Sequence, residues 1–581
     1  MPPRVVWLLL LTLVAACVRP TPAPAPPEAL PQRLVLALDG IDYRDIVAAR
    51  ERGLFTMFRA PSRLVSTFPS ISDVAWHDIF GVLPPAGYQR VFFSRAAGAV
   101  VGRPLDAIAP IEYEERMDLA FGGRFHHLSA YLISDRVARE EIDDGIAAFW
   151  RTRDRRTLYV YNVGPDALQH TNGKLGEYLQ HLDERLRALD ETYRARTGRA
   201  LEIVLLSDHG HNRAAAARFL PLVESLTAQG FAVRGRLDGP RDVALSVDGV
   251  TTGFGVFCAP ESTADVARAL AATEGIDVVT RMVDARQIHV QAGTQSAWIE
   301  RDGRDAGRLR YRVEQGDPLE HASVVATLRA AGAMDDDGFA PESAWIRASM
   351  QARHPAALPR IVRGHTTITL NPAPILVSVA VGYRVGFGFV SVANRLRPLG
   401  GTHGALDSTS ALGVVMTTFR DTHDDVTSSV RLQLDAFADL GAPQRHAPVA
   451  RLTTGARLAM DPRGAFREGL VPTDAEGPGV VVTLAEAATD QMRLVLALRP
   501  SLRALPDVGL AWEQVVDFGR AVASSDPRVR FLPFARLDAP HFEAGRSFSL
   551  HIQIDPGDGS AGLALPTLTV RTGPDGRLIV H

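Results

Sequence analysis

The sequence predicts an α/β protein with a mostly parallel central sheet flanked by helices. Three short apolar runs, at 33–38, 157–163 and 201–206, have the length and the uniform hydrophobicity of strands that are buried on both faces. Between the second and third runs, leucine and tyrosine recur at helical spacing over 175–193, which predicts an amphipathic helix. A strand, a helix and a strand in succession form the repeating unit of a parallel sheet.

The composition is that of an ordinary globular protein. The chain has 581 residues, of which 46% are hydrophobic and 22% are charged, so it can bury a large core. The 63 basic and 66 acidic residues leave a net charge of −3. This balance offers no general attraction for nucleic acid, and we expect no stable nucleic-acid complex. The sequence leaves the oligomeric state open.

Residues 1–17 have the pattern of a bacterial lipoprotein signal peptide. Arg4 precedes an apolar run from Val5 to Ala16, which is too short for a mature membrane helix of about 20 residues. Small residues stand directly before Cys17, as in signals whose cysteine is acylated and becomes the new N-terminus. An ordinary secretory signal is the alternative. We expect an extracytoplasmic protein, held on the cell envelope at the periplasmic side or the cell surface by a lipid on Cys17.

The next segment predicts an extended tether. Residues 18–31 are dense in proline, which cannot donate a hydrogen bond to a helix or a sheet. The chain has two cysteines, so lipidation of Cys17 would leave Cys258 without an intramolecular partner. The fold must therefore be stable without disulfides.

The segment from about 212 to 370 is less regular and predicts a smaller, inserted α+β subdomain. It contains a helical pattern at 264–273 and strand-like runs at 278–290 and 296–312.

Two apolar regions follow this insert. The stretch 375–393 is interrupted by Arg384 and by glycines, which favours a hairpin of two strands over a membrane helix. Beyond about 430, proline and glycine punctuate the short apolar runs 480–482, 492–498 and 568–570. We expect a main domain over 32–430 and a C-terminal accessory domain over 431–581.

Acidic and histidine side chains follow the three predicted strands. Asp39 comes after the first, Asp166 and His170 after the second, and Asp208 and His209 after the third. Because the carboxyl ends of parallel strands meet at one edge of a sheet, we expect these side chains to lie close together.

A further candidate is His403, within Gly-Thr-His-Gly. Three aspartates and three histidines make two sets of three ligands, which suits two zinc ions, although other divalent metals are possible. Taken singly, such an aspartate is more often a helix cap and such a histidine a core or surface residue. The prediction therefore depends on the whole set.

A turn rich in hydroxyl groups, Ser66 to Ser72, precedes a predicted helix. A serine at the start of a helix gains from the amide dipoles there, and a metal ion would favour its alkoxide. The alternative is that these hydroxyls only cap the helix.

Together these residues resemble the alkaline phosphatase superfamily, and within it the type I phosphodiesterase and nucleotide pyrophosphatase branch. The resemblance covers about 33–425. It rests on five motifs in order: Leu-Asp39-Gly, Phe-Pro-Ser-Ile-Ser72 before Ala-Trp, Gly-Pro-Asp166 with His170 four residues on, Ser-Asp208-His209-Gly, and Gly-Thr-His403-Gly. The implied fold is an alkaline-phosphatase-like central sheet with an inserted subdomain and a C-terminal accessory region.

The resemblance also implies a site and a reaction. One zinc ion would be surrounded by Asp39, Ser72, Asp208 and His209, and the other by Asp166, His170 and His403. Ser72 would be the nucleophile in the zinc-dependent hydrolysis of a small phosphate ester, a phosphodiester or nucleotide pyrophosphate, through a phospho-serine intermediate. Two Zn²⁺ and three carboxylates sum to one positive charge, which would attract an anionic phosphoryl group.

Which hydroxyl attacks depends on the alignment within this turn. Members of the branch that begin Thr-Phe-Pro-Asn use that first threonine, which here would point to Thr67. Members that read Phe-Pro-Ser-Thr-Thr, or that have a threonine four residues before the tryptophan, align instead on Ser72, and the Ala75-Trp76 context favours Ser72. Ser70 is the third candidate.

Neighbouring classes differ in how well the sequence supports them. Phosphomonoesterases and phosphonate hydrolases of the same superfamily share these ligands, and a non-catalytic, lipid-anchored binding protein with the same fold is a further alternative. A sulfatase is disfavoured, because Cys258-Ala-Pro260 lacks the arginine of the sulfatase motif and follows Asp208. Neither a P-loop nor a dinucleotide fingerprint occurs.

Overall fold

The computed structural model describes residues 30–422, with gaps at 81–83, 96, 103–112, 114–116, 121–129, 131–132, 154, 172, 215–216, 304, 306, 370 and 387–399, and short strands beyond residue 449. The expected signal peptide, Cys17 and nearly all of the expected tether lie outside these residues. Within the described part of the chain, no helix combines the length and the hydrophobicity that crossing a membrane requires.

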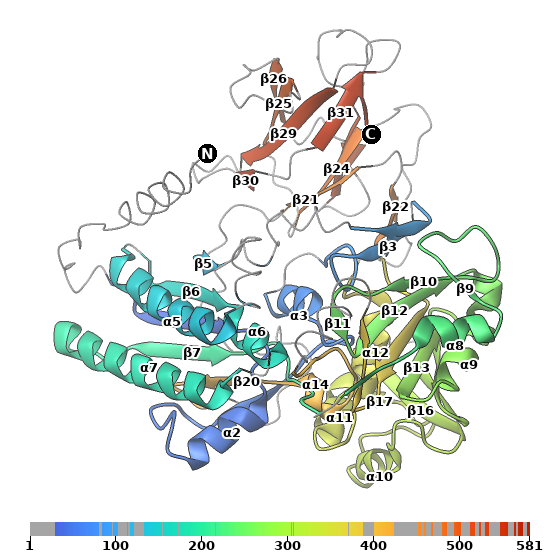
Figure 1. Ribbon diagram of the computed structural model, residues 1–581, viewed down its shortest axis with the longest axis horizontal. Helices are drawn as coiled ribbons and strands as arrows, with labels where there is room; N and C mark the ends of the chain where they lie inside the picture. The colour runs from blue at the N-terminus through green and yellow to red at the C-terminus, as the bar shows by residue number, and fades with distance from the viewer. Residues whose placement is uncertain are drawn as a thin grey trace, which may run out of the picture.

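A six-stranded, mostly parallel sheet confirms the predicted fold class (Figure 1). Its order is β2 (Ser62–Val65), β20 (Leu412–Thr417), β7 (Glu202–Leu206), β1 (Arg33–Leu38), β6 (Thr157–Asn162) and β5 (Leu119–Ala120). The three predicted strands are neighbours, because β1 pairs in parallel with both β6 and β7. Among these six strands, β20 alone runs in the opposite direction, antiparallel to both β2 and β7.

Both faces of this sheet are buried. Alternate residues of β1 point to opposite sides, with Leu34 and Leu36 in one hydrophobic core and Val35 in the other. The first core is covered by α2 (Tyr43–Glu51), α5 (Ser134–Arg151) and α7 (Leu175–Thr197), and the second by α3 (Ser72–Ile79). The predicted amphipathic helix is therefore confirmed as α7.

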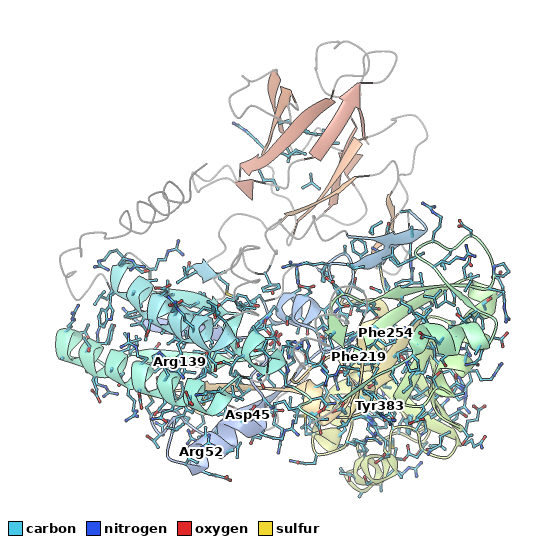
Figure 2. The ribbon with its side chains drawn as sticks, in the orientation of Figure 1. Asp45, Arg52, Arg139, Phe219, Phe254 and Tyr383 are labelled. Carbon is cyan, nitrogen blue, oxygen red and sulfur yellow. The ribbon has the colours of Figure 1, made fainter. Side chains whose placement is uncertain are left out.

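An ion pair on the outer surface joins two of these helices. Arg139 of α5, labelled in Figure 2, lies 2.7 Å from Glu177 of α7. Both side chains are exposed, so the pair contributes little to stability.

The insert is larger than expected, since it forms a nine-stranded sheet beside the first one (Figure 1). Its order is β17 (Ala340–Pro341), β16 (Arg308–Gln315), β15 (Gln295–Arg301), β14 (Gln287–Ala292), β13 (Ile276–Met282), β18 (Ile375–Val379), β12 (Gly253–Cys258), β10 (Asp242–Ser246) and β9 (Ala232–Val233). Because β18 lies inside this sheet, the unit extends past the expected boundary at residue 370.

Helices cover both faces of the larger sheet as well. One core contains side chains of α8 (Leu222–Ala228) and α9 (Thr263–Ala271) together with Phe254 of β12, labelled in Figure 2. The opposite core contains side chains of α10 (Ala322–Ala330), α11 (Glu342–Ser349) and α12 (Ala357–Thr366).

The stretch after residue 375 forms strands, but they do not pair as the predicted hairpin. Both edges of β18 are taken by β12 and β13, so β19 (Tyr383–Gly386) has no edge of β18 to join. It pairs instead with β8 (Arg218–Phe219) and β11 (Val250–Thr251), and Figure 2 labels Tyr383 and Phe219. Residues 387–393 of the expected hairpin lie outside the described residues.

The remaining elements are short. They are the pair β3 (Phe92–Ser94) and β4 (Ala99–Val101), the helices α6 (Gly164–His170) and α14 (Ser408–Ala411), and the 3₁₀ turn η4 (Pro260–Ser262).

The described strands beyond residue 449 pair only with one another. They are β21 (Ala450–Thr454), β22 (Leu458–Met460), β23 (Phe466–Glu468), β24 (Gly479–Leu484), β25 (Arg493–Pro500), β26 (Trp512–Asp517), β27 (Val522–Ala523), β28 (Val529–Pro533), β29 (Ser547–Asp555), β30 (Leu563–Ala564), β31 (Leu568–Thr572) and β32 (Leu578–Val580).

Candidate metal centre and nucleophile

The three predicted aspartate ligands meet at the carboxyl edge of the six-stranded sheet. Asp39 directly follows β1, Asp208 follows β7, and Asp166 lies in α6, which begins after β6. All three carboxylates are buried. Because β6, β1 and β7 are adjacent and parallel, their ends deliver these side chains to one place, as predicted.

A glycine allows the chain to turn inside this cluster. Gly40 has φ +70°, which favours glycine. A Cβ at this position would lie 2.8 Å from Nε2 of His211 and 3.1 Å from Oδ1 of Asp166. A larger residue would therefore collide with the candidate ligands.

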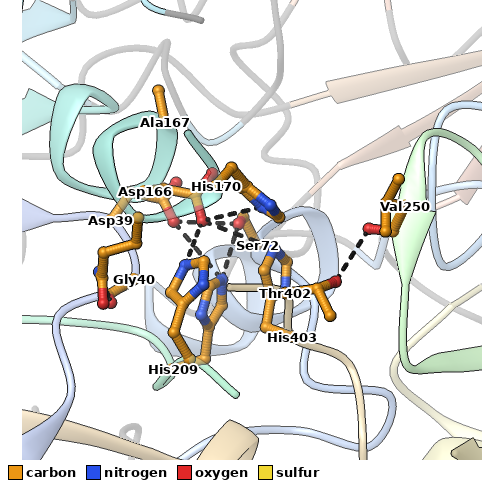
Figure 3. Close-up of polar contacts among 12 residues, drawn as sticks. Asp39, Gly40, Ser72, Asp166, Ala167, His170, His209, Val250, Thr402 and His403 are labelled. Atoms are coloured by element: carbon orange, nitrogen blue, oxygen red, sulfur yellow. Dashed lines mark hydrogen bonds and ion pairs between the residues drawn. The ribbon is translucent and has the colours of Figure 1, made fainter. Parts of the chain in front are cut away.

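The first ligand set consists of Asp39, Asp208 and His209, whose ligand atoms all lie within 4.8 Å of one another. Figure 3 labels Asp39 and His209 of this set. Nδ1 of His209 is 3.1 Å from the Gly210 carbonyl oxygen, which can only accept a hydrogen bond, so Nδ1 carries a proton. Burial lowers the pKa of His209 well below its ordinary value, and in the neutral ring Nε2 is then unprotonated. It lies 3.5 Å from Oδ1 of Asp39 and 3.3 Å from Oδ2 of Asp208.

Ser72 completes this set with a hydroxyl group. Its Oγ lies 3.0 Å from Nε2 of His209 and donates to Oδ1 of Asp39 at 3.1 Å. Ser72 is the first residue of α3, and the N-cap of that helix, Ile71, makes no side-chain capping bond. The hydroxyl of Ser72 therefore faces the ligand cluster and does not cap its helix.

The other two hydroxyl candidates face backbone carbonyl groups. Oγ1 of Thr67 donates to the carbonyl oxygen of Pro69 at 2.8 Å. Oγ of Ser70 lies 3.0 Å from the carbonyl oxygens of both Thr67 and Ala405. Of the three hydroxyls, only that of Ser72 contacts candidate metal ligands.

The second ligand set is centred on Asp166. The ligand atoms of Asp166, His209, His211 and His403 all lie within 4.8 Å of one another. His170 lies beside the same carboxylate, with Nε2 at 3.5 Å from Oδ1 of Asp166, but it is not in that set.

The ring of His403 is oriented by the turn that leads into Ser72. Its Nδ1 lies 2.8 Å from the carbonyl oxygen of Ser70 and so carries the proton. The unprotonated Nε2 lies 3.6 Å from Oδ1 of Asp166. All seven residues named from the sequence are thus gathered at one buried position.

His211 is a candidate ligand that the sequence reasoning missed. It is fully buried, and its Nε2 lies 2.7 Å from Oδ1 of Asp166. Its Nδ1 has no hydrogen-bond partner among the described residues. The signal was a second histidine two positions after His209, one residue beyond the motif that ends at Gly210.

Two aromatic residues hold the outer oxygen of Asp39. The hydroxyl of Tyr161 donates to Oδ2 at 2.5 Å, and the indole Nε1 of Trp76 is 3.4 Å from the same atom. Oδ1 is left to face Ser72 and His209. The β6 strand supplies Tyr161 because alternate residues of that strand point to this side of the sheet.

Burial controls the charges of the cluster. It raises the pKa of Asp39 well above its ordinary value, with added repulsion from Asp208 and Asp166, and it raises the pKa of Asp208 to about 8. Burial also lowers the pKa of His209 and His403. Burial alone would raise the pKa of Asp166, but the neighbouring imidazole of His170 and the hydrogen bond from His211 hold it well below its usual range.

The residues present fit divalent cations. Oδ2 of Asp208 is a buried carboxylate oxygen with no hydrogen-bond partner among the described residues, which is costly without a compensating positive charge. It points toward the unprotonated Nε2 of His209. Nitrogen and carboxylate oxygen ligands in this combination suit zinc and similar metals.

Comparisons with known proteins give matches by structure only. No protein-family model and no curated protein sequence matches the chain. Murine ectonucleotide pyrophosphatase/phosphodiesterase 5 is 12% identical over 71% of this chain and 96% of its own, with a TM-score of 0.38. The human protein of the same name is 11% identical over 70% of this chain and 95% of its own, with a TM-score of 0.37. An inactive murine variant in complex with AMP gives an identity of 13% and a TM-score of 0.37.

Proposed function

We propose that this protein is a metal-dependent phosphoric ester hydrolase, with zinc as the metal and with phosphodiesters or nucleotide pyrophosphates as the substrate class. One observation carries the proposal: the hydroxyl of Ser72 lies within hydrogen-bond distance of both Asp39 and His209, two members of a buried ligand set. The substrate class rests on the resemblance of the five motifs to the phosphodiesterase and nucleotide pyrophosphatase branch.

Each ligand set would hold one ion. Asp39, Asp208 and His209 would hold the first next to Ser72. Asp166 and His403 would hold the second, together with His211 of the second ligand set or with His170, which the resemblance implies. When bound, the ions supply Lewis acidity that favours the serine alkoxide and offsets charge on the phosphoryl and leaving oxygens.

The chain itself orients the nucleophile. Oδ1 of Asp39 accepts the hydrogen bond of Ser72 and fixes the direction of its Oγ. Attack by Oγ forms an oxygen–phosphorus bond while the bond from phosphorus to the leaving oxygen breaks, which gives a phosphorylated serine that keeps the second ester group of a diester. The proton lost from Oγ passes to solvent, and the leaving oxygen takes up a proton from solvent. Attack by water on that phosphorus then releases the phosphate product and restores the hydroxyl. The N-terminal end of α3 adds a partial positive charge beside the anionic phosphoryl group.

The alternatives predict different substrate preferences. A phosphomonoesterase or phosphonate hydrolase would use the same ligands and the same Ser72. A non-catalytic binding protein would have no need of a nucleophile placed against the ligands, and the position of Ser72 therefore favours an enzyme.

The proposal is tested with the zinc-loaded protein that begins after Cys17, with its metal content counted. Hydrolysis of bis-p-nitrophenyl phosphate and p-nitrophenyl phosphate is compared in the wild type, in Ser72→Ala and in the matched control Thr67→Val. We expect a diester preference that Ser72→Ala abolishes and Thr67→Val retains. A monoester preference would change the substrate class, and loss of activity only in Thr67→Val would move the nucleophile.

We further propose that the protein is a lipoprotein of the cell envelope, anchored through Cys17. The small residues before Cys17 and the proline-rich residues 18–31 support this proposal. Metabolic labelling with a fatty acid should mark the wild type and should not mark Cys17→Ser. Equal labelling of the two proteins would contradict it.

A further inference from the structure

A buried arginine lies behind the nucleophile. Arg360 of α12 is only 1% exposed. Among the described residues, no carboxylate lies within ion-pair distance of its guanidinium group. The chain therefore holds a cation in its interior that the charge of Asp407 stabilises only at longer range, which is costly unless its hydrogen bonds are met.

Backbone carbonyl groups and one hydroxyl meet those bonds. Nε and Nη2 donate to the carbonyl oxygen of Thr67 at 3.3 and 3.0 Å, and Nη2 also donates to Oγ of Ser70 at 2.9 Å. Nη1 donates to the carbonyl oxygens of Pro355 at 3.0 Å and Leu406 at 2.7 Å. All five N–H groups of the guanidinium are thus used.

Three of the four acceptor residues, Thr67, Ser70 and Leu406, belong to two loops that carry candidate catalytic groups, while Pro355 lies just before α12. Residues 66–71, here called the nucleophile loop, lead directly into Ser72. Residues 402–407, here called the histidine loop, contain His403. Arg360 donates to both loops at once, from a helix that belongs to neither.

Ser70 joins the same two loops a second time. The N–H of Ser70 donates to the carbonyl oxygen of Gly404 at 3.0 Å, and the Oγ of Ser70 lies 3.0 Å from the carbonyl oxygen of Ala405. Its own carbonyl oxygen accepts from Nδ1 of His403 at 2.8 Å. The position of His403 is therefore tied to a residue only two positions before Ser72.

The chemistry of arginine explains why this position is not apolar. If packing alone were required, a neutral side chain of similar length would fill the space without the cost of burying a charge. The planar guanidinium instead binds acceptors from several segments in fixed directions, which the single ammonium group of lysine cannot do. Burial lowers the pKa of Arg360 to about 9. Because this value is still above neutral pH, the guanidinium group keeps its charge there.

We propose that Arg360 and Ser70 are positioning residues that fix the nucleophile loop against the histidine loop, and thereby set Ser72 relative to His403. Because Ser72 lies in the first ligand set and His403 in the second, this joint fixes the nucleophile with respect to both metal positions. The inference rests on the proposed function.

The test compares Arg360→Met, Arg360→Lys and Ser70→Ala in the zinc-loaded protein. Misplacement by about 1 Å can cost about 100-fold in rate, so we expect kcat for bis-p-nitrophenyl phosphate to fall on the order of 100-fold in Arg360→Met. KM should change much less, and Arg360→Lys should recover part of the loss. Ser70→Ala removes one hydroxyl, keeps the backbone bonds, and should show a smaller loss of kcat in a protein that folds.

Arg33→Met is the matched control. Arg33 is also buried, but it lies at the opposite end of β1 from Asp39 and pairs with Glu202 at 2.5 Å. This control should lower the unfolding temperature and leave kcat per folded molecule unchanged. If Arg360→Met and Ser70→Ala behave in the same way as Arg33→Met, the positioning role is wrong.

A second measurement does not depend on hydrolysis. The visible spectrum of the Co²⁺-substituted protein reports the geometry of the ligands, and we expect it to change in Arg360→Met and not in Arg33→Met. If the wild type hydrolyses no phosphate ester, the proposed function fails while the spectrum still decides the positioning role. The positioning role is overturned if the spectrum of Arg360→Met is unchanged and its kcat is unchanged too. It is also overturned if the spectrum is unchanged and the wild type is inactive.

Discussion

At the level of single residues, proton binding and metal binding compete for the same buried atoms. Asp39 and Asp208 have raised pKa values because burial disfavours their charged forms. His209 and His403 have lowered pKa values for the same reason. A divalent ion would stabilise the carboxylates in their charged form and bind the imidazoles in their neutral form.

This competition predicts a pH dependence for the metal-free protein. A pKa raised in the folded state gives stability that is complete below the unfolded value and is lost as the pH rises through the folded value, which for Asp208 is about 8. We therefore expect the unfolding temperature of EDTA-treated protein to fall as the pH rises to about 8 and to level off above it, most clearly above about pH 6.5, where the histidines of the unfolded chain are neutral. Saturating zinc should remove this fall, because the ion binds the deprotonated carboxylates.

Asp208→Asn separates this effect from general alkaline instability. The variant has one fewer carboxyl group to ionise in the folded state, so its stability should depend less on pH over the same range. The unfolding temperature of both proteins is measured by calorimetry without metal over this pH range. If it changes with pH equally in the wild type and in Asp208→Asn, Asp208 is already ionised at neutral pH.

Tyr161 is expected to tune metal affinity without touching the metal. Tyr161→Phe removes the hydrogen bond to Oδ2 of Asp39 and should weaken zinc binding by about 10-fold to 100-fold, measured by competition with a chelator. Tyr178→Phe is the matched control, because the hydroxyl of Tyr178 is buried without a hydrogen-bond partner among the described residues. Equal affinities in the two variants would remove Tyr161 from the site.

At the level of elements, the turn after β1 depends on glycine for two separate reasons. Gly40 and Gly198 both have φ +70°, so alanine at either position should cost about 1 kcal/mol from backbone strain. A Cβ at Gly198 would meet nothing within 4 Å, whereas one at Gly40 would collide with His211. We expect both alanine variants to lose stability and only Gly40→Ala to lose zinc binding, measured by unfolding and metal titration. Tight zinc binding by Gly40→Ala would contradict this geometry of the turn.

The elements that were predictable are those whose signal is local. The strand at 33–38 and the helix at 175–193 have hydrophobic patterns that do not depend on distant residues. The partner of β19 could not be predicted, because the edges of β18 are occupied by strands that lie 90 or more residues earlier in the chain. The size of the insert could not be predicted for the same reason.

The same distinction applies to the site. Asp39 and Asp208 stand at the ends of recognisable strands, and their clustering follows from parallel pairing. Arg360 carries no such signal, because it lies 293 positions from Thr67, whose carbonyl oxygen it contacts. His211 had a local signal, but its contact with Asp166 depends on the turn at Gly40.

At the level of the whole molecule, the ligand cluster joins the two large sheets. The aspartates come from the edge of the six-stranded sheet, while the histidine loop is attached to strands of the insert. Oγ1 of Thr402 donates to the carbonyl oxygen of Val250 in β11 at 3.2 Å (Figure 3), and the N–H of Leu406 donates to Oγ of Ser378 in β18 of the nine-stranded sheet at 2.9 Å. Metal ions bound between these groups would hold the two sheets together.

Metal binding should therefore stabilise the described domain as a unit. Zinc present at about 100 times its dissociation constant adds about 2.7 kcal/mol for each independent site. Calorimetry should show one transition that moves to higher temperature with zinc, and the shift should be smaller in His403→Ala. A transition that zinc does not move would contradict the proposed coupling between the sheets.

The most direct test of the proposed function is to trap the intermediate. Zinc-loaded protein is mixed with bis-p-nitrophenyl phosphate, quenched in acid within one turnover and digested, and the peptides are examined by mass spectrometry. We predict a phosphoryl adduct on Ser72, and no adduct in Ser72→Ala. Turnover with the adduct on Thr67, or with no adduct on any residue, would contradict the assignment of Ser72 as the nucleophile.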